Sequence, residues 1–171
     1  QRTQTNLADV IIEAVARLEP QHRANQQTVV MELDDDLPPV DIDIDRMDQV
    51  LTNLIGNAIK YSPPGGEIRI TTTYAGKVKD LPPSAPPDTR LPCIVICVCD
   101  QGKGLTSEDA QRIFLPFYRT EASRVDKVEG VGLGLAIAQS IVHMHHGKIW
   151  AAPATRRRPG GQFMFTIPLE E

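Results

Sequence analysis

The chain has 171 residues, of which 41% are hydrophobic and 5% aromatic, a composition typical of one ordinary globular domain. Its formal charge of −4 at pH 7 gives no electrostatic reason to expect nucleic acid as a partner, so a bound polyanion must be held locally, by a metal or a shaped loop. No apolar stretch approaches the roughly 20 residues that cross a bilayer, and no signal segment is recognisable. A parent protein anchored in a membrane would therefore be anchored through another segment.

The cysteines indicate a reducing, cytoplasmic setting. Cys93, Cys97 and Cys99 lie within one apolar run, and their spacing fits neither a zinc knuckle nor the disulfide framework of a secreted domain. A chain of this length buries enough surface to be stable without a disulfide or a structural zinc ion. We therefore expect ordinary core cysteines.

The first part of the chain predicts two helices and two short strands. Apolar residues at helical spacing over 6–19 indicate an amphipathic helix. Two short strands, 28–33 and 40–44, are separated by an acidic turn. A second helix over 45–61 is expected to have Asp45 as its N-cap and to end where prolines begin.

The rest of the chain contains more strands and one more helix. Segment 80–92 has five prolines and no periodic pattern, so we expect an exposed, semi-extended hairpin loop there. The order of elements favours an α/β fold in which helices are layered on one face of a mixed sheet. The other expected elements are strands at 67–74 and 93–99, a helix over 131–145, and strands at 148–152 and 162–169.

The polar side of helix 45–61 is the first candidate site. Asn53, Asn57 and Lys60 share one stripe of this helix, opposite its apolar side. Amide oxygens are hard, neutral ligands that suit magnesium, and a lysine adds a point charge against phosphates. A solvated helix side is the structural alternative.

A carboxylate leaves a buried strand at Asp100, beside Gly102 and Gly104. An ionised carboxylate accepts hydrogen bonds, so it suits an exocyclic amine such as that of adenine, and glycines let the backbone approach a flat base. A simple strand-ending turn is the alternative.

Two further segments are candidates for phosphate contacts. The aromatic stretch 113–119 precedes a polar stretch, so Arg119 and Arg124 could reach phosphates from a loop, or could simply face solvent. Alternating glycines then open helix 131–145; they match neither the dinucleotide fingerprint nor a P-loop, but a helix N-terminus favours a phosphate. An ordinary glycine-rich turn is the alternative. These glycines are Gly130, Gly132 and Gly134.

In this order the four segments resemble the ATP-binding catalytic domain of sensor histidine kinases, within the group that includes gyrase, the Hsp90 chaperones and MutL. Residues 53–62 are similar to the N box of that family, 100–105 to its G1 box, 114–119 to its F box and 130–136 to its G2 box. The resemblance extends from about residue 7 to residue 169.

The resemblance implies a two-layer α/β sandwich of the Bergerat type, with ATP and Mg²⁺ between helix 45–61 and a lid. It implies that Asn57 coordinates Mg²⁺, that Asn53 and Lys60 face the phosphates, and that Arg119 or Arg124 contacts the γ-phosphate. The other residues that it places around the nucleotide are Tyr61, Asp100, Gly102, Gly104, Leu105, Gly130, Gly132, Leu133, Gly134 and Leu135.

One position distinguishes transfer from hydrolysis within the group. Hydrolysing relatives have a glutamate one turn before the magnesium asparagine, and this chain has Asn53 there. An amide cannot take a proton from water, so the resemblance favours transfer of the phosphoryl group to a histidine.

The acceptor histidine is expected on a separate dimerisation domain, of the same protein or a partner, with a response regulator downstream. The surroundings of His22 do not match an acceptor, so we expect the chain to begin just after that domain and to be a monomer. Two alternatives stay open: an ATP-binding regulatory or docking module without turnover, and a serine kinase of the anti-sigma-factor type.

Overall fold

A mixed sheet forms the centre of the molecule. The computed structural model describes residues 1–126, 130 and 132–170. In this part of the chain a five-stranded sheet has the order β2-β4-β5-β7-β6, in which β2 and β4 are parallel and all other neighbours antiparallel. The strands are β2 (Thr28–Glu32), β4 (Glu67–Ala75), β5 (Cys93–Cys99), β6 (Ile149–Ala152) and β7 (Gln162–Pro168).

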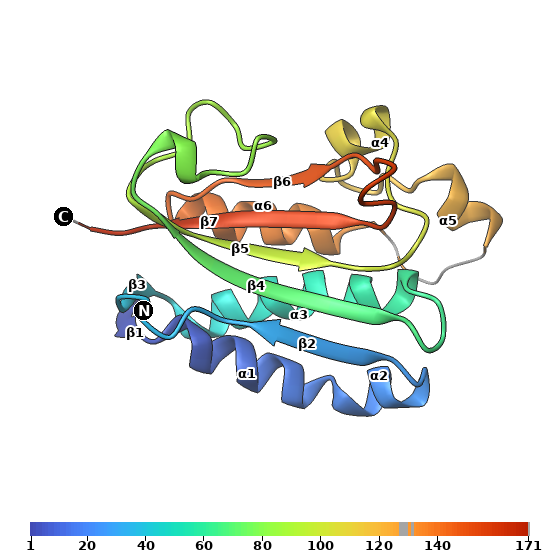
Figure 1. The fold of residues 1–171 in the computed structure, drawn as a ribbon, viewed down its shortest axis with the longest axis horizontal. Coiled ribbons are helices and arrows are strands. Elements are labelled where there is room, and N and C mark those ends of the chain that lie inside the picture. The colour runs from blue at the N-terminus through green and yellow to red at the C-terminus, as the bar shows by residue number, and fades with distance from the viewer. Residues whose placement is uncertain (127–129, 131, 171) are drawn as a thin grey trace.

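Three helices cover one face of this sheet: α1 (Leu7–Arg17), α3 (Ile44–Tyr61) and α6 (Gly134–Met144). They lie side by side, with α3 between the other two (Figure 1). The prediction of helices on one face of a mixed sheet is therefore confirmed. No helix among the described residues is both long and apolar enough to cross a membrane.

The main core lies between the helices and the sheet. Along α3 one side is fully buried, and Asn53 and Asn57 lie on the other side at intermediate exposure. Burial of the apolar side fixes the rotation of the helix, so its polar stripe must face away from the core. The buried residues of α3 are Met47, Val50, Leu51, Leu54, Ile55, Ala58 and Ile59.

Two helix boundaries differ from the expectation. The N-cap of α3 is Asp43, whose side chain accepts a hydrogen bond from the backbone N–H of Arg46; Asp45 lies within the first helical turn. Asp43 has the extended backbone that a cap requires, so the prediction of Asp45 was wrong. Helix α6 begins at Gly134, later than expected, and Val131 lies outside the described residues.

Some short elements were not predicted, and one predicted strand, expected over 40–44, lies outside the main sheet. Strand β3 (Val40–Ile42) pairs with β1 (Thr3–Thr5) in a separate two-stranded sheet, so it is not part of the main one. The pairing joins residues far apart in the sequence, which local patterns cannot indicate. The other unexpected elements are α2 (Glu19–Ala24), the 3-10 helix η1 (Val78–Asp80), α4 (Ser107–Arg112) and α5 (Glu121–Val125).

The proline-rich loop between β4 and β5 covers part of the sheet face opposite the helices. Leu81, Ala85 and Leu91 pack on a second apolar cluster that includes Trp150. The indole N–H of Trp150 donates to Ser84 Oγ at 3.0 Å. The expectation of an exposed loop holds only in part: six of the 13 residues 80–92 are exposed and none is buried, but the apolar residues between the prolines pack against the sheet surface.

Candidate functional site

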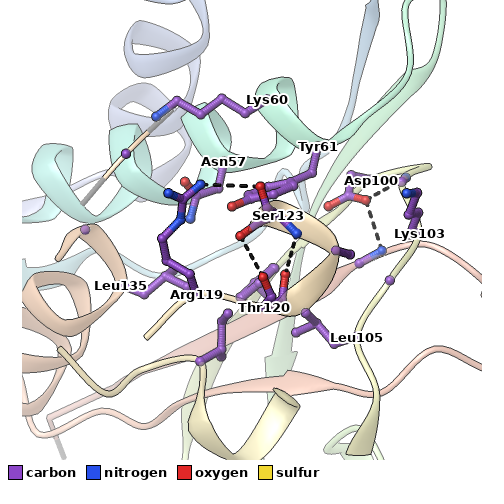
Figure 2. Close-up of a pocket in the computed structure, with 18 of the residues that line it drawn as sticks. Asn57, Lys60, Tyr61, Asp100, Lys103, Leu105, Arg119, Thr120, Ser123 and Leu135 are labelled. Carbon is purple, nitrogen blue, oxygen red and sulfur yellow. Dashed lines mark hydrogen bonds between the residues drawn. The ribbon is translucent and has the colours of Figure 1, made fainter. Parts of the chain in front are cut away.

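A cavity of about 610 Å³ lies between the C-terminal half of α3, the loop after β5, α5 and the start of α6 (Figure 2). Its volume is within the range of about 300–1,000 Å³ usual for small-molecule sites. Four segments that are separate in the sequence meet at its walls. The cavity is therefore the place to test the candidate residues.

Helix α3 supplies the polar stripe expected from the sequence. Asn53, Asn57 and Lys60 all line the cavity, and Lys60 extends to solvent. The side-chain Nδ2 of Asn53 donates to the carbonyl oxygen of Gly134 at 3.0 Å. This bond ties α3 to the first residue of α6, so the Asn53 amide has a positioning role that spacing alone does not indicate.

Asp100 occupies the opposite wall, directly after β5. Its Oδ1 accepts from the backbone N–H of Gly102 at 2.8 Å and of Gly161 at 3.0 Å. Burial raises the pKa of Asp100, while these two hydrogen bonds act in the other direction. Because both bonds go to Oδ1, the carboxylate is held in one orientation, and Oδ2 can accept a hydrogen bond from a ligand.

Close backbone approaches require glycine on both sides of Asp100. A Cβ on Gly102 would lie 2.4 Å from the carbonyl oxygen of Tyr61, and a Cβ on Gly161 would lie 2.5 Å from Asp100 Oδ2. Sequence reasoning missed Gly161. Its position just before β7 becomes informative only once β7 is known to be the antiparallel neighbour of β5, which local sequence does not show.

A chain of hydrogen bonds supports the end of α3 next to Asp100. The buried Gln27 donates through Nε2 to the carbonyl oxygens of Ile59 and Ser62, at 3.0 and 3.1 Å. Ser62 Oγ accepts from the backbone N–H of Gln101 at 3.1 Å. The end of α3 and the loop that follows Asp100 are thereby held in one arrangement.

Arg119 lines the cavity just before α5 (Glu121–Val125). Thr120 caps this helix, because its Oγ1 accepts from the backbone N–H of Ser123 at 3.1 Å and its carbonyl oxygen accepts from Ser123 Oγ at 3.0 Å. Arg119 Nη2 donates to the carbonyl oxygen of Ser123 at 3.4 Å. In the view of Figure 2, Ser123 lies between Asn57 and Asp100, and Arg119 lies on the Asn57 side. Arg124 is exposed on α5 and is not among the residues that line the cavity.

The loop before α5 is joined to the start of α6. The backbone N–H of Phe117 donates to the carbonyl oxygen of Gly132 at 2.9 Å. Gly132 has φ +75°, and a Cβ there would lie 2.9 Å from Phe117 C. At the other end of the wall, Lys103 Nζ and Asp126 form an ion pair of 2.8 Å. These contacts connect three of the four candidate segments directly.

The structure brings together every residue that the sequence analysis placed around a nucleotide, Arg124 excepted. Lining residues that were missed include Thr120, Ser123, Gly161 and Phe163. Their signals were a cap motif, a glycine pair and an apolar strand, all common in any fold. The expected residues found at the cavity are Asn53, Asn57, Lys60, Tyr61, Asp100, Gly102, Gly104, Leu105, Arg119, Gly130, Gly132, Leu133, Gly134 and Leu135.

Comparison with known proteins identifies the family. A family described as "Histidine kinase-, DNA gyrase B-, and HSP90-like ATPase" matches residues 42–171. The chain belongs to this family. It is 34% identical over 157 residues to the adaptive-response sensory kinase SasA of Synechococcus elongatus, and 39% identical over 132 residues to the sensor histidine kinase WalK of Bacillus subtilis.

These alignments cover 92% and 77% of this chain but only 36% of SasA and 19% of WalK. The chain thus corresponds to one part of each relative. Among solved structures, the catalytic domain of histidine kinase ThkA is 29% identical with a TM-score of 0.76, over 98% of this chain and 95% of that one. ThkA in complex with the response regulator TrrA matches with 29% identity and a TM-score of 0.72, over 99% of this chain and 42% of that one. The predicted resemblance to a histidine kinase catalytic domain is confirmed.

Replacing Gly102 with alanine tests the packing around Asp100. The added Cβ would overlap the carbonyl oxygen of Tyr61, so we expect Gly102→Ala to lower the free energy of unfolding by about 1–3 kcal/mol in urea titrations. The matched control is Gly56→Ala, in the middle of α3, where a Cβ meets nothing within 4 Å. Alanine there should stabilise by about 0.5–1 kcal/mol. Equal effects of the two substitutions would contradict the geometry.

Proposed function

We propose that this domain binds Mg-ATP and transfers its γ-phosphoryl group to a histidine on a separate helical dimerisation domain. The acceptor domain belongs to the same protein or to a partner subunit, and a response regulator then receives the phosphoryl group. The observation that carries the proposal is the fixed carboxylate of Asp100 across one cavity from Asn57. We place the domain in the cytoplasm, where ATP is available, and expect the isolated chain to be a monomer.

Asp100 supports adenine binding at one end of the cavity. Its Oδ1 is occupied by two backbone N–H groups, so Oδ2 can accept from the exocyclic amine of adenine. Gly102 and Gly104 let the loop after Asp100 pack closely against its neighbours, because a Cβ would lie 2.4 Å from the carbonyl oxygen of Tyr61 at the first position and 2.5 Å from that of Pro159 at the second. Tyr61 lines the same end of the cavity.

The other end of the cavity suits the phosphates. Lys60 and Arg119 supply positive charge, and the N-terminus of α6 opens at Gly134. Among the described residues no side chain caps α6, so its first backbone N–H groups can face a phosphate. The glycines 130 and 132 let the backbone approach closely.

Asn57 fits magnesium through its amide oxygen. Magnesium keeps several waters and binds through few protein groups together with substrate phosphates. In the described part of the chain no cluster of three or more His, Cys, Asp or Glu could hold a metal, which agrees with a cation that arrives with ATP. When bound, the cation would neutralise charge on the phosphates.

The cavity favours transfer over hydrolysis. The carboxylates among its described lining residues are Asp100 and Asp126; the first accepts two backbone N–H groups and the second pairs with Lys103. Asn53 is an amide and is bonded to Gly134. Among these described residues an attacking water would find no base, whereas the unprotonated nitrogen of an imidazole is itself a nucleophile that bonds to the γ-phosphorus while ADP leaves.

Calorimetric titration with ADP and with a non-hydrolysable ATP analogue, with and without Mg²⁺, tests the nucleotide site. Loss of a charged acceptor should cost about 1.5–3 kcal/mol, so we expect Asp100→Asn to bind at least about tenfold more weakly. Asn57→Ala should lose the gain in affinity that Mg²⁺ gives and keep the Mg²⁺-independent part. Asp35→Asn, in the exposed acidic turn, is the matched control and should bind like the unaltered chain. No binding by the folded unaltered chain would overturn the proposal.

The raised pKa of Asp100 also predicts a dependence on pH. Only the ionised carboxylate can accept through both oxygens, so nucleotide affinity should fall as the pH is lowered from neutral through this raised pKa. A raised pKa means that the folded state binds the proton more tightly than the unfolded state. The contribution of Asp100 to the free energy of unfolding should therefore rise as the pH is lowered through the same range. Asp100→Asn should show neither change. Titrations at several pH values measure the first effect and urea unfolding the second; an affinity of the unaltered chain that stays constant over this range would contradict the assigned role.

A further inference from the structure

Two cysteines lie together on the sheet face opposite the helices. Cys97 and Cys99 are two positions apart in β5, so their side chains point to the same side, and their sulfur atoms are 3.1 Å apart. Both are partly exposed and both are free thiols. Cys93, on the same side of the same strand, is fully buried in the second apolar cluster.

The charges around the pair make the two sulfurs unequal. The hydrogen bond with Cys97, together with the positive charges of Arg158 and Arg69, lowers the pKa of Cys99, against the opposing effects of burial and Asp100. The same hydrogen bond and burial raise the pKa of Cys97. Arg69 faces Cys99 across the β4–β5 pair. Burial alone raises the pKa of Cys93 to about 11. Cys99 is therefore the thiol that ionises first.

We propose that Cys97 and Cys99 form a redox-active dithiol whose oxidant is a peroxide. The Cys99 thiolate attacks one oxygen of hydrogen peroxide, the O–O bond breaks, and hydroxide leaves behind a sulfenic acid. The Cys97 sulfur then attacks the Cys99 sulfur; the S–S bond forms, the S–O bond breaks, and the departing hydroxide takes the Cys97 proton as water. In total two thiols are oxidised to a disulfide and one peroxide is reduced to two waters.

The spacing in the strand makes this disulfide a reversible one. Residues two apart in a strand have Cα atoms roughly 6.6 Å apart, close to the upper limit of about 6.8 Å for disulfides, and their nearly parallel Cα–Cβ bonds hold the Cβ atoms farther apart than the roughly 3.5–4.5 Å of a disulfide. The bond therefore closes only when this end of β5 shifts. A bond closed at this limit is readily reduced by a cellular dithiol. A bound metal is the less suitable occupant, because the described residues offer the two sulfurs no third ligand.

Oxidation would act on the neighbouring cavity. Asp100 follows Cys99 directly, and Cys97 and Cys99 are paired with β4 and β7 on both sides. Closing the disulfide shortens this end of β5, which moves the Asp100 carboxylate relative to the backbone of Gly161. We therefore expect the oxidised chain to bind nucleotide more weakly; this consequence rests on the proposed function, whereas the dithiol chemistry does not.

Mass spectrometry of the peroxide-treated chain tests the dithiol. We expect an intrachain disulfide between Cys97 and Cys99, seen as the loss of two hydrogens and reversed by dithiothreitol. In Cys97→Ser, Cys99 should stop at a sulfenic acid that dimedone traps. Cys93→Ala, the matched control on the same strand, should behave like the unaltered chain. No disulfide in the folded, treated chain, or a disulfide between chains only, would overturn the proposal.

Limiting alkylation of the reduced chain tests the assigned order of reactivity. Cys99 should be labelled at least about tenfold faster than Cys97 or Cys93, because the thiolate is the reactive form and Cys99 has the largest thiolate fraction. A thiolate of lower pKa is a weaker nucleophile, which offsets part of this gain in rate. Equal labelling of Cys97 and Cys99 would contradict the assignment of Cys99 as the attacking thiol.

Titration with ADP before and after oxidation tests the coupling between the dithiol and the nucleotide site: weaker binding is expected in the unaltered chain and no change in Cys97→Ser. A mass shift without any change in affinity would refute the coupling alone, and a reduced chain that binds no ADP would refute the proposed function alone.

Discussion

The Asp100 carboxylate lies at the end of a buried strand, where desolvation disfavours its charge and two backbone N–H groups favour it. This balance depends on the sheet. Gly161 reaches Asp100 because β7 is the antiparallel neighbour of β5, and Gly102 reaches it because the chain turns back immediately. The pairing of two central strands and the chemistry of the cavity are therefore set by the same contacts, and the cysteines just before Asp100 share that position.

Helix α3 makes the second half of the site through its packing. Its apolar side is buried against the sheet, which turns Asn53 and Asn57 to the cavity, and Gln27 holds its last turn. The Asn53 amide donates to Gly134, so α3 and the start of α6 are joined directly at the cavity wall. Under the proposed function, alignment and charge would supply the catalysis, as phosphoryl transfer requires.

Patterns with strong local causes were readable from the sequence. The periodicity of α3, the strand before Asp100 and the four motif segments predicted the mixed sheet and 14 of the 25 lining residues. The prediction of the α3 N-cap failed because two nearby residues meet the local requirement equally well. Asp43 and Asp45 are both good caps, and only the backbone conformation decides between them. The packing of the proline-rich loop over Trp150 and the approach of Gly161 depend on contacts between distant segments, which no local pattern encodes.

The most direct test of transfer is incubation of this chain with γ-labelled ATP, Mg²⁺ and a histidine-containing dimerisation domain supplied separately. Label that appears on the acceptor, is stable in base and labile in acid, and disappears when the acceptor histidine is replaced by alanine is the predicted result. Release of free phosphate at the same rate with and without the acceptor domain, or label on a serine, would contradict the account.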